Sequence, residues 1–467
     1  MGFFYKKLIR RLELMKTKNK FCKLFKINEI QTLVLGFLII ILFGTVLLHL
    51  PISSTNRSYT SFIDSLFVST SATCVTGLVT VDTGNHWSYF GKVVIMILIQ
   101  VGGLGFMSFS TLFALIIGRK ITLKERMIIH ESLNSFNLQG LVKMSKYILI
   151  FTFLIEFIGA VILSIQFIPE FGFIKGLFFS VFHSISAFCN AGIDLFGDGK
   201  SLTPYSNNYL VIFTISSLII IGGLGFYVWQ ELWSIFYSSK RVKLSLHSKV
   251  VLITTCILIV SGTVLFFIFE RNNTATIGNM STKNKILSCV FASITPRTAG
   301  FNSISLADIN GNSKLLTMIL MFIGGSPGST AGGIKTTTLA IIILTVLSII
   351  SGRENTEICN RTIDKNTVYK SLVVLSIGII IVFVSSIMLS ITESGTTMEN
   401  ILFESVSAFG TVGLSLGITP NLTPFGKFVI SMVMFLGRLG GLTIILSIVK
   451  RTTPNSIKYP KGRILIG

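Results

Sequence analysis

The sequence predicts an all-α integral membrane protein made of four tandem copies of one unit: a long helix, a short helix, a turn and a second long helix. Three observations lead to this fold class. The 467 residues are 51% apolar with only 19 acidic residues, long apolar runs alternate with short basic segments, and glycine-containing turns recur regularly. A soluble domain of this length could not cover so much apolar surface. Four units in pseudo-fourfold arrangement would give eight transmembrane helices around a central pore.

Five apolar runs are long enough to cross a bilayer, which takes roughly 17–25 helical residues. They cover residues 32–48, 147–165, 209–228, 250–269 and 372–389. The first run follows a basic segment, as a signal peptide does, but no small-residue cleavage site comes after it. We therefore expect it to be a retained transmembrane helix.

The distribution of charge predicts how the chain is oriented. The formal net charge is +21, and most of the 40 Lys and Arg residues fall within residues 1–30, 119–146, 240–249, 353–370 and 450–467. The segments between them carry acidic residues and few lysines. This alternation follows the positive-inside rule, so the basic segments and both termini should be cytoplasmic. It also argues against a nucleic-acid partner. Because the sequence carries no targeting signal, we expect a multi-pass protein of a bacterial plasma membrane.

The four units follow one another between the basic segments. We place repeat 1 at residues 31–118, repeat 2 at 145–237, repeat 3 at 247–350 and repeat 4 at 368–450, with cytoplasmic segments at 1–30 and 451–467. Each repeat has a middle segment of about 12 residues, which is too short to cross and should enter the membrane and turn back. These middle segments are residues 62–73, 176–188, 284–295 and 397–409.

A glycine follows each middle segment, and a second glycine cluster follows later in each repeat. The turn glycines are Gly77, Gly192, Gly300 and Gly413, and the later clusters begin at Gly102, Gly222, Gly324 and Gly437. A serine stands six residues before the turn glycine in three repeats (Ser71, Ser186 and Ser407), whereas repeat 3 has Ser293 one position early. For the later clusters, close packing between helices is an alternative explanation, because small residues often serve that purpose in membranes.

The turns themselves predict a cation path. A backbone that turns back at membrane depth must face water or be buried in protein. Four such turns around one axis would form a ring of carbonyl oxygens that can replace the hydration shell of an alkali cation. The short helices would point their partly negative C-termini at the same axis, and glycine adopts positive φ cheaply. Repeat 4 reads Thr411-Val-Gly413, which matches the start of the potassium-channel filter TVGYG. The candidate filter residues are Val75, Thr76, Gly77, Asn190, Ala191, Gly192, Thr298, Ala299, Gly300, Thr411, Val412 and Gly413.

The second apolar run of repeat 3 is too long for one crossing and contains a glycine-rich stretch at residues 324–336. Glycine, proline and hydroxyl residues should not stay helical there. We interpret the break as a gate under the filter, with a passive break as the alternative. A nucleotide P-loop is excluded because Ile334, not glycine, precedes Lys335. The candidate gate residues are Gly324, Gly325, Ser326, Gly328, Ser329, Thr330, Gly332, Gly333, Lys335 and, from repeat 4, Arg438.

Two arginines lie inside or beside this predicted path. A charge near mid-membrane costs roughly 2.5 kcal/mol or more, so Arg438 should face the pore or a partner. The available partners are Glu404, Glu156 or a carbonyl oxygen of the gate segment. A cation in the path would repel ions, so we expect Arg297 to point outward and brace the third turn.

Other polar residues give weaker signals. We expect Asp64 to cap the first short helix. Asp194 fits either the outer mouth of the pore or a solvated loop, and Glu156 has no identified partner. The six cysteines and five histidines are scattered, which indicates neither a disulfide framework nor a metal site. It also disfavours an intramembrane enzyme, which would need clustered catalytic groups.

The chain resembles the Ktr/Trk/HKT superfamily of potassium transport proteins, and most closely its KtrB-type membrane subunits. The segments that carry the resemblance are 73–78, 188–193, 297–302 and 409–414 around the turn glycines, 324–336, and Gly437-Arg438. It extends from about residue 31 to the C-terminus. It implies a potassium uptake subunit rather than an enzyme, with potassium at the filter residues, an intramembrane gate at 324–336 and Arg438 as an electrostatic barrier. Retention of Gly77 implies a preference for potassium, because its loss in the family goes with sodium permeation.

The resemblance also implies partners. It implies a homodimer on a cytoplasmic ring of KtrA-type nucleotide-binding subunits and stimulation by sodium, with no covalently bound cofactor and with nucleotide acting only through the partner. Residues 1–26 are a candidate contact for that ring or for anionic membrane lipid. An alternating-access symporter is the rival within transport, but it would need inverted repeats, whereas these four units run in parallel.

Overall fold

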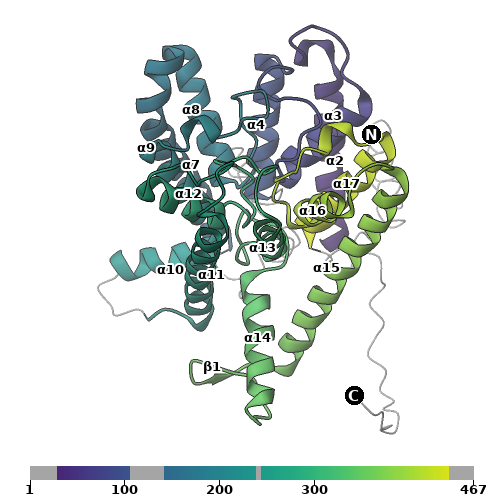
Figure 1. Cartoon of the computed structure of the whole chain (residues 1–467). Helices are drawn as coiled ribbons and strands as arrows, with labels where there is room; N and C mark the ends of the chain where they lie inside the picture. The colour runs from purple at the N-terminus through teal and green to yellow at the C-terminus, as the bar shows by residue number, and fades with distance from the viewer. Residues whose placement is uncertain (1–28, 106–140, 238–242, 441–467) are drawn as a thin grey trace, which may run out of the picture.

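The computed structural model describes residues 29–105, 141–237 and 243–440, in which helices are joined by loops and the only strands are those of one short hairpin (Figure 1). The basic termini, most of the segment between repeats 1 and 2, and the last residues predicted for repeat 1 (106–118) and repeat 4 (441–450) lie outside these residues. Repeat 1 comprises α2 (Glu29–His49), α3 (Phe62–Cys74) and α4 (Tyr89–Leu104), and repeat 2 comprises α7 (Leu141–Phe171), α8 (Phe173–Phe188), α9 (Tyr209–Gly223) and α10 (Phe226–Tyr237). Repeat 3 comprises α11 (Leu246–Glu270), α12 (Thr282–Ile294), α13 (Gly311–Phe322) and α14 (Thr336–Ile350), and repeat 4 comprises α15 (Lys365–Thr392), α16 (Met398–Gly410) and α17 (Pro424–Leu439). Three 3₁₀ helices, η1 (Pro51–Ser53), η2 (Thr203–Tyr205) and η3 (Thr419–Asn421), lie in the connecting loops.

The first helix of each repeat is its long apolar member. In the described residues α2, α7, α11 and α15 are long and apolar enough to cross a membrane, and α9 with α10 makes a fifth if the bent pair is one span. Helices α4, α8 and α14 are apolar but shorter. The chain is thus a helical protein with several membrane-crossing helices, and the total of eight spans stays a prediction.

The short middle helices are where the sequence predicts them. Helices α3, α8, α12 and α16 begin and end within three residues of the predicted segments. Helix α8 starts earlier than predicted because Gly172, with φ 82°, separates it from α7 already at Phe173. Each of these helices packs against the first helix of its own repeat.

Contacts between repeats follow one rule. Each short helix also packs against the second helix of the preceding repeat: α8 on α4, α12 on α9, and α16 on α13. Helix α3 of repeat 1 packs on α17 of repeat 4, so the series returns to its start (Figure 1). The C-terminal ends of the short helices are therefore brought toward one another.

The second helices differ from the prediction. The sequence indicated continuous runs in repeats 1, 2 and 4 and a break only in repeat 3. Instead α4 ends at Leu104 and α17 ends at Leu439, the rest of these two predicted runs lying outside the described residues, and α9 and α10 are bent by 98°. A glycine with positive φ follows each break, with values of 78° at Gly105, 93° at Gly225 and 81° at Gly440.

Close packing explains why these breaks fall where they do. A methyl group on Gly102, Gly222 or Gly437 would collide with a carbonyl oxygen at the end of a short helix, that of Thr73, Phe188 or Phe409 respectively. The packing alternative therefore holds for these glycines. They let each second helix approach the end of the short helix of its own repeat.

A small hairpin joins α14 to α15. Strands β1 (Glu357–Ile358) and β2 (Arg361–Thr362) pair antiparallel beside the lower part of α14 (Figure 1). Its turn residues, Cys359 and Asn360, both have positive φ, 49° and 61°. The sequence did not predict this hairpin because Cys-Asn lacks the glycine that usually marks such turns.

Candidate ion-conduction site

The four turns after the short helices have the same backbone geometry. We name them turn 1 (residues 75–77), turn 2 (190–192), turn 3 (298–300) and turn 4 (411–413). Each turn begins with a non-glycine residue in the left-handed region and ends on a glycine with positive φ. The values are 58° and 102° for Val75 and Gly77, 60° and 64° for Asn190 and Gly192, 74° and 79° for Thr298 and Gly300, and 50° and 91° for Thr411 and Gly413.

Such backbone strain costs of the order of 1–3 kcal/mol for each non-glycine residue, and it persists only where the surroundings enforce it. Here it recurs at equivalent positions of four turns. In turn 1 the N–H of Thr76 is bonded to the carbonyl oxygen of Ser71 at 2.8 Å, and in turn 4 the N–H of Val412 is bonded to that of Ser407 at 2.9 Å. The last turn of the short helix therefore holds the strained segment in place.

The turn glycines touch one another in a closed series. A methyl group on Gly77 would collide with the carbonyl oxygen of Ala191 in turn 2. The other three collisions would be Gly192 with Ala299 in turn 3, Gly300 with Val412 in turn 4, and Gly413 with Thr76 in turn 1. The order of contacts therefore places turn 1 opposite turn 3 and turn 2 opposite turn 4. None of the four positions has room for a β-carbon.

All four glycines line one cavity. The cavity has a volume of about 460 Å³ and is also lined by Asp194, Asp198 and the loop that follows turn 4. We call it the vestibule. Of the two environments predicted for Asp194, the structure places it in this vestibule, partly buried, with Oδ1 accepting the N–H of Phe196 at 3.0 Å.

A hydroxyl group of each short helix braces the turn that follows. Ser71 Oγ accepts the N–H of Gly77 at 3.0 Å, and Ser407 Oγ accepts that of Gly413 at 3.1 Å. In repeat 2, Ser186 Oγ donates to the carbonyl oxygen of Ile193 at 2.7 Å.

In repeat 3 the bracing hydroxyl belongs to Thr295, which donates to the carbonyl oxygen of Phe301. The sequence-based register, which assigned this position to Ser293, is therefore wrong. Ser293 Oγ instead donates to Ile259 of α11 at 2.9 Å, as Ser69 and Ser184 donate to the first helices of repeats 1 and 2. The error arose because the sequence separation between the bracing hydroxyl residue and the turn glycine is one residue shorter in repeat 3 than in the other repeats.

The predicted break in repeat 3 lies directly against the turns. Residues 323–335, which we call the gate loop, connect α13 to α14. A methyl group on Gly332 would collide with Thr411 Oγ1, and one on Gly324 would lie 3.3 Å from Thr298 Cγ2. The gate loop thus sits under turns 3 and 4, and glycine allows this close approach.

The gate loop is also held by the bend between α9 and α10. The N–H of Ser326 donates to Gly223 at 3.0 Å, and the N–H of Phe226 donates to Gly328 at 2.9 Å. Thr330 Oγ1 donates to Phe188 at the end of α8 at 3.3 Å. Lys335 donates within its own loop, to the carbonyl oxygen of Ala331 at 2.6 Å.

Arg438 connects the gate loop to repeat 1. Its Nη1 donates to the carbonyl oxygen of Thr330, and its Nη2 donates to those of Gly102 and Gly103 at the end of α4. Of the partners that the sequence offered, the structure selects the gate-loop carbonyl. The two acidic residues that the sequence offered as partners accept hydrogen bonds from other side chains. Gln100 donates to Glu156 at 3.1 Å, and Ser415 and Thr419 donate to Glu404.

Two further charged residues were singled out in the sequence. Arg297 is buried, and its Nη2 lies 3.4 Å from Thr255 Oγ1 of α11, which agrees with a brace rather than an ion ligand. Asp64 does not cap α3, whose N-terminal cap is Ser61. It forms an ion pair at 2.8 Å with Lys427 of α17, because α3 packs on α17 across the boundary between repeats 1 and 4.

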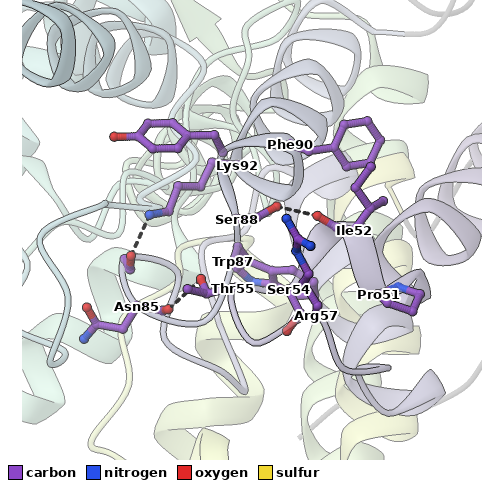
Figure 2. A pocket seen from close by; sticks show the side chains of 12 residues that line it. Pro51, Ile52, Ser54, Thr55, Arg57, Asn85, Trp87, Ser88, Phe90 and Lys92 are labelled. Carbon is purple, nitrogen blue, oxygen red and sulfur yellow. Dashed lines mark hydrogen bonds between the residues drawn. The ribbon is translucent and has the colours of Figure 1, made fainter.

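A larger cavity, of about 930 Å³, has none of the turn residues in its lining; Figure 2 shows the residues that do line it. It is lined by residues of the η1 region and the start of α4, and Ser88 Oγ donates across it to Ile52 at 2.6 Å. Arg57 and Lys92 line it, and Lys92 Nζ donates to the carbonyl oxygen of Gly84 at 2.6 Å. This cationic lining does not suit a path for cations. The vestibule has Asp194 and Asp198 beside the four turns, and its one lysine, Lys200, is paired with Asp198 at 3.0 Å.

Comparisons with known proteins show the family to which the chain belongs. The family model TrkH, described as a cation transport protein, matches residues 1–459. The chain is 43% identical to the potassium/sodium uptake protein NtpJ of Enterococcus hirae, over 95% of this chain and 98% of that protein. It is 42% identical to the Ktr system potassium uptake protein B of Bacillus subtilis, over 96% of this chain and 99% of that protein. The crystal structure of the potassium transporter TrkH from Vibrio parahaemolyticus matches with a TM-score of 0.68 at 18% identity, covering 89% and 84% of the two chains, which supports the fold. The chain therefore belongs to the TrkH family of cation transport proteins.

Proposed function

We propose that this chain is the membrane subunit of a potassium uptake system, with one cation pore per chain. The single observation that carries the proposal is the closed series of four glycine turns around one vestibule. The name of the relative NtpJ gives potassium and sodium, and that of Ktr protein B gives potassium. In this account potassium is the transported ion, and sodium stimulates uptake or is a second permeant ion.

Selection would occur at turns 1 to 4, whose residues are the proposed filter. A ring of backbone carbonyl oxygens can replace the water around an alkali cation, and the field of carbonyl dipoles distinguishes ions by size. The C-terminal ends of α3, α8, α12 and α16 add partial negative charge to the same region. Pseudo-fourfold arrangement of eight spans around this axis is part of the proposal.

Gating would occur at residues 324–336 with Arg438. The gate loop lies against turns 3 and 4 and is tied by Arg438 to the end of α4. Because the loop consists largely of small residues, it can leave the axis without moving bulky side chains. Arg438 contributes a positive charge that repels cations while the loop is in place.

We extend the proposal to assembly and location. A homodimer resting on a cytoplasmic ring of KtrA-type nucleotide-binding subunits fits the Ktr system to which several relatives belong. Nucleotide would then act only through that partner. The protein would span a bacterial plasma membrane with both termini in the cytoplasm, and residues 1–26 and the tail from 451 lie outside the described residues.

The experiment that tests this function is radioactive rubidium uptake into liposomes that contain the purified protein and are loaded with potassium. We expect uptake that potassium competes for and that proceeds without an imposed sodium gradient. Empty liposomes are the control. Uptake that strictly requires a sodium gradient would favour the rival symporter, and absence of any cation flux from a folded protein would refute transport.

Asp194 gives this function a predicted pH dependence. Burial is the main cause that raises the pKa of the Asp194 carboxyl group, to about 6, and nearby Asp82 acts in the same direction. A carboxylate is charged only above its pKa, so the negative charge in the vestibule is lost as the external pH falls through about 6. We expect rubidium uptake to decrease over that range, because the vestibule then attracts cations less.

Asp194→Asn should remove this pH step and lower uptake at neutral pH. The matched control is Asp198→Asn in the same vestibule. Lys200, at 3.0 Å, lowers the pKa of Asp198, so that carboxylate stays charged over the same pH range. If uptake by the Asp194→Asn protein still decreases over the same pH range, Asp194 is not the cause of the pH dependence.

A further inference from the structure

The corrected register of repeat 3 allows the four short helices to be aligned residue by residue. Each contains a fully buried phenylalanine, followed two and four residues later by a hydroxyl residue. The aligned segments are Phe67-Val-Ser-Thr-Ser71, Phe182-His-Ser-Ile-Ser186, Phe291-Ala-Ser-Ile-Thr295 and Phe403-Glu-Ser-Val-Ser407. The position after the phenylalanine is occupied by Val68, His183, Ala292 and Glu404. The repeats are therefore alike around this position and differ at it.

In repeat 4 the residue at this position is Glu404, which forms hydrogen bonds with the segment that follows turn 4. Its side chain is fully buried, and its two carboxylate oxygens accept hydrogen bonds from Ser415 Oγ, at 2.8 Å, and from Thr419 Oγ1. Ser415 Oγ in turn accepts the N–H of Gly417 at 3.0 Å. Ser415 and Thr419 both line the vestibule. The carboxylate therefore connects the middle of α16 to the vestibule wall next to Gly413.

His183 makes the corresponding connection in repeat 2. It is fully buried, its Nδ1 lies 2.7 Å from the carbonyl oxygen of Phe179, and its Nε2 accepts the N–H of Leu195 at 3.3 Å. These partners assign the proton to Nδ1. The ring also stacks on Phe196 with centroids 4.4 Å apart. The middle of α8 is thus joined to the segment that leaves turn 2.

Repeats 1 and 3 cannot form this connection, because Val68 and Ala292 carry no polar group. The contacts between the turn glycines put turn 2 across from turn 4 and turn 1 across from turn 3. The two polar connections therefore support two opposite turns of the closed series, turns 2 and 4, whereas turns 1 and 3 rely on apolar packing at this position. We call the connections made by His183 and Glu404 the polar brackets.

We propose that the polar brackets of His183 and Glu404 are positioning elements that set the width of the candidate filter between turns 2 and 4, and so its preference for potassium over sodium. The inference rests on the proposed function of the turns. Both side chains are fully buried and neither lines the vestibule, so both act through the backbone they hold. Removal of the carboxylate or the imidazole leaves its donors, the hydroxyl groups of Ser415 and Thr419 or the N–H of Leu195, without that acceptor. The backbone must then shift to satisfy them.

The test compares each bracket residue with the residue that another repeat uses at the same position. The variants Glu404→Val and His183→Val introduce the side chain of repeat 1. Val68→Ala, which introduces the side chain of repeat 3, is the control, because it removes buried volume without removing a bracket. Each protein is reconstituted in liposomes, and the ratio of potassium to sodium permeability is measured together with the thermal unfolding temperature.

We expect Glu404→Val and His183→Val each to lower the potassium-to-sodium permeability ratio by about tenfold, because the free energy of one lost buried hydrogen bond corresponds to a factor of that size. We expect Val68→Ala to leave the ratio unchanged. Glu404→Gln, which keeps one acceptor oxygen, should restore part of the ratio. If the valine variants do not fold, the double variant Ser415→Ala, Thr419→Val removes the donors from the vestibule side and should lower the ratio in the same way.

Two results would overturn the inference. One is a wild-type ratio in folded Glu404→Val and His183→Val, or in the double variant of Ser415 and Thr419. The other is an equal loss of the ratio in Val68→Ala, which would mean that any packing defect in a short helix has this effect. If the wild-type protein itself passes no cation, the proposed function fails instead, so the two failures are distinguishable.

Discussion

Replacing Arg438 by alanine is expected to raise the cation flux through the protein at least about tenfold. Arg438 is the side chain that ties the gate loop, at Thr330, to the end of α4, at Gly102 and Gly103. Charge-assisted hydrogen bonds to carbonyl oxygens contribute roughly 1.5–3 kcal/mol each, and a difference of about 1.4 kcal/mol is tenfold in an equilibrium. Loss of even one such bond should therefore increase the open fraction measurably. The repulsive charge near the ion path is lost as well.

The measurement is rubidium uptake into liposomes without any cytoplasmic partner, at matched protein content. Arg438→Lys separates the two causes, because lysine keeps the charge but cannot reproduce the planar fork that serves several carbonyl groups at once. We expect Arg438→Lys to leak less than Arg438→Ala and more than the wild type. The control is Arg353→Ala, which removes an exposed arginine paired with Glu357 at 3.1 Å. Equal flux in all four proteins would exclude Arg438 from gating.

Replacing Gly77 by serine is expected to lower the preference for potassium over sodium by roughly tenfold or more, the range that a strain of about 1–3 kcal/mol would produce. Gly77 has φ 102°, which side-chain-bearing residues rarely adopt, and a β-carbon there would collide with the carbonyl oxygen of Ala191 in turn 2. Both effects must displace the backbone of turns 1 and 2. A displaced ring of oxygens no longer matches one ion size.

The ratio of potassium to sodium permeability is the measurement, and Gly395→Ser is the matched control. Gly395 also has positive φ, 108°, but nothing lies within 4 Å of an added β-carbon. The control therefore carries similar backbone strain away from the turns. A folded Gly77→Ser protein that keeps the wild-type ratio would show that turn 1 does not select ions.

Much of the fold could be predicted because it depends on local patterns. The long first helices are uniformly apolar. The short helices are too short to cross and are each followed by a turn with a glycine, so the positions of the short helices were found to within three residues. The turn glycines were recognised because the same small residue recurs at one place in each repeat. Strain at Val75, Thr298 and Thr411 left no such signal, because nothing in those side chains favours a positive φ. Asn190 is the exception, because asparagine adopts this conformation more readily than other side-chain-bearing residues.

The parts that could not be predicted depend on contacts between distant segments. The break after Gly223 follows from the contact of Gly222 with Phe188, and an apolar helix in isolation gives no sign of it. The role of Thr295 was hidden by a one-residue difference in turn length. The partner of Arg438 was undecided because a carbonyl oxygen is present at every residue, and only the folded chain shows which one lies within reach.

The claim on which the account depends is that the four turns surround a site for a cation. Anomalous diffraction from crystals of the protein grown in rubidium or thallium salts tests it most directly. The account predicts a peak on the axis between the backbone oxygens of turns 1 to 4, which weakens when potassium is added. A peak at the cavity beside Arg57 and Lys92, or none between the turns at full rubidium concentration, would contradict it.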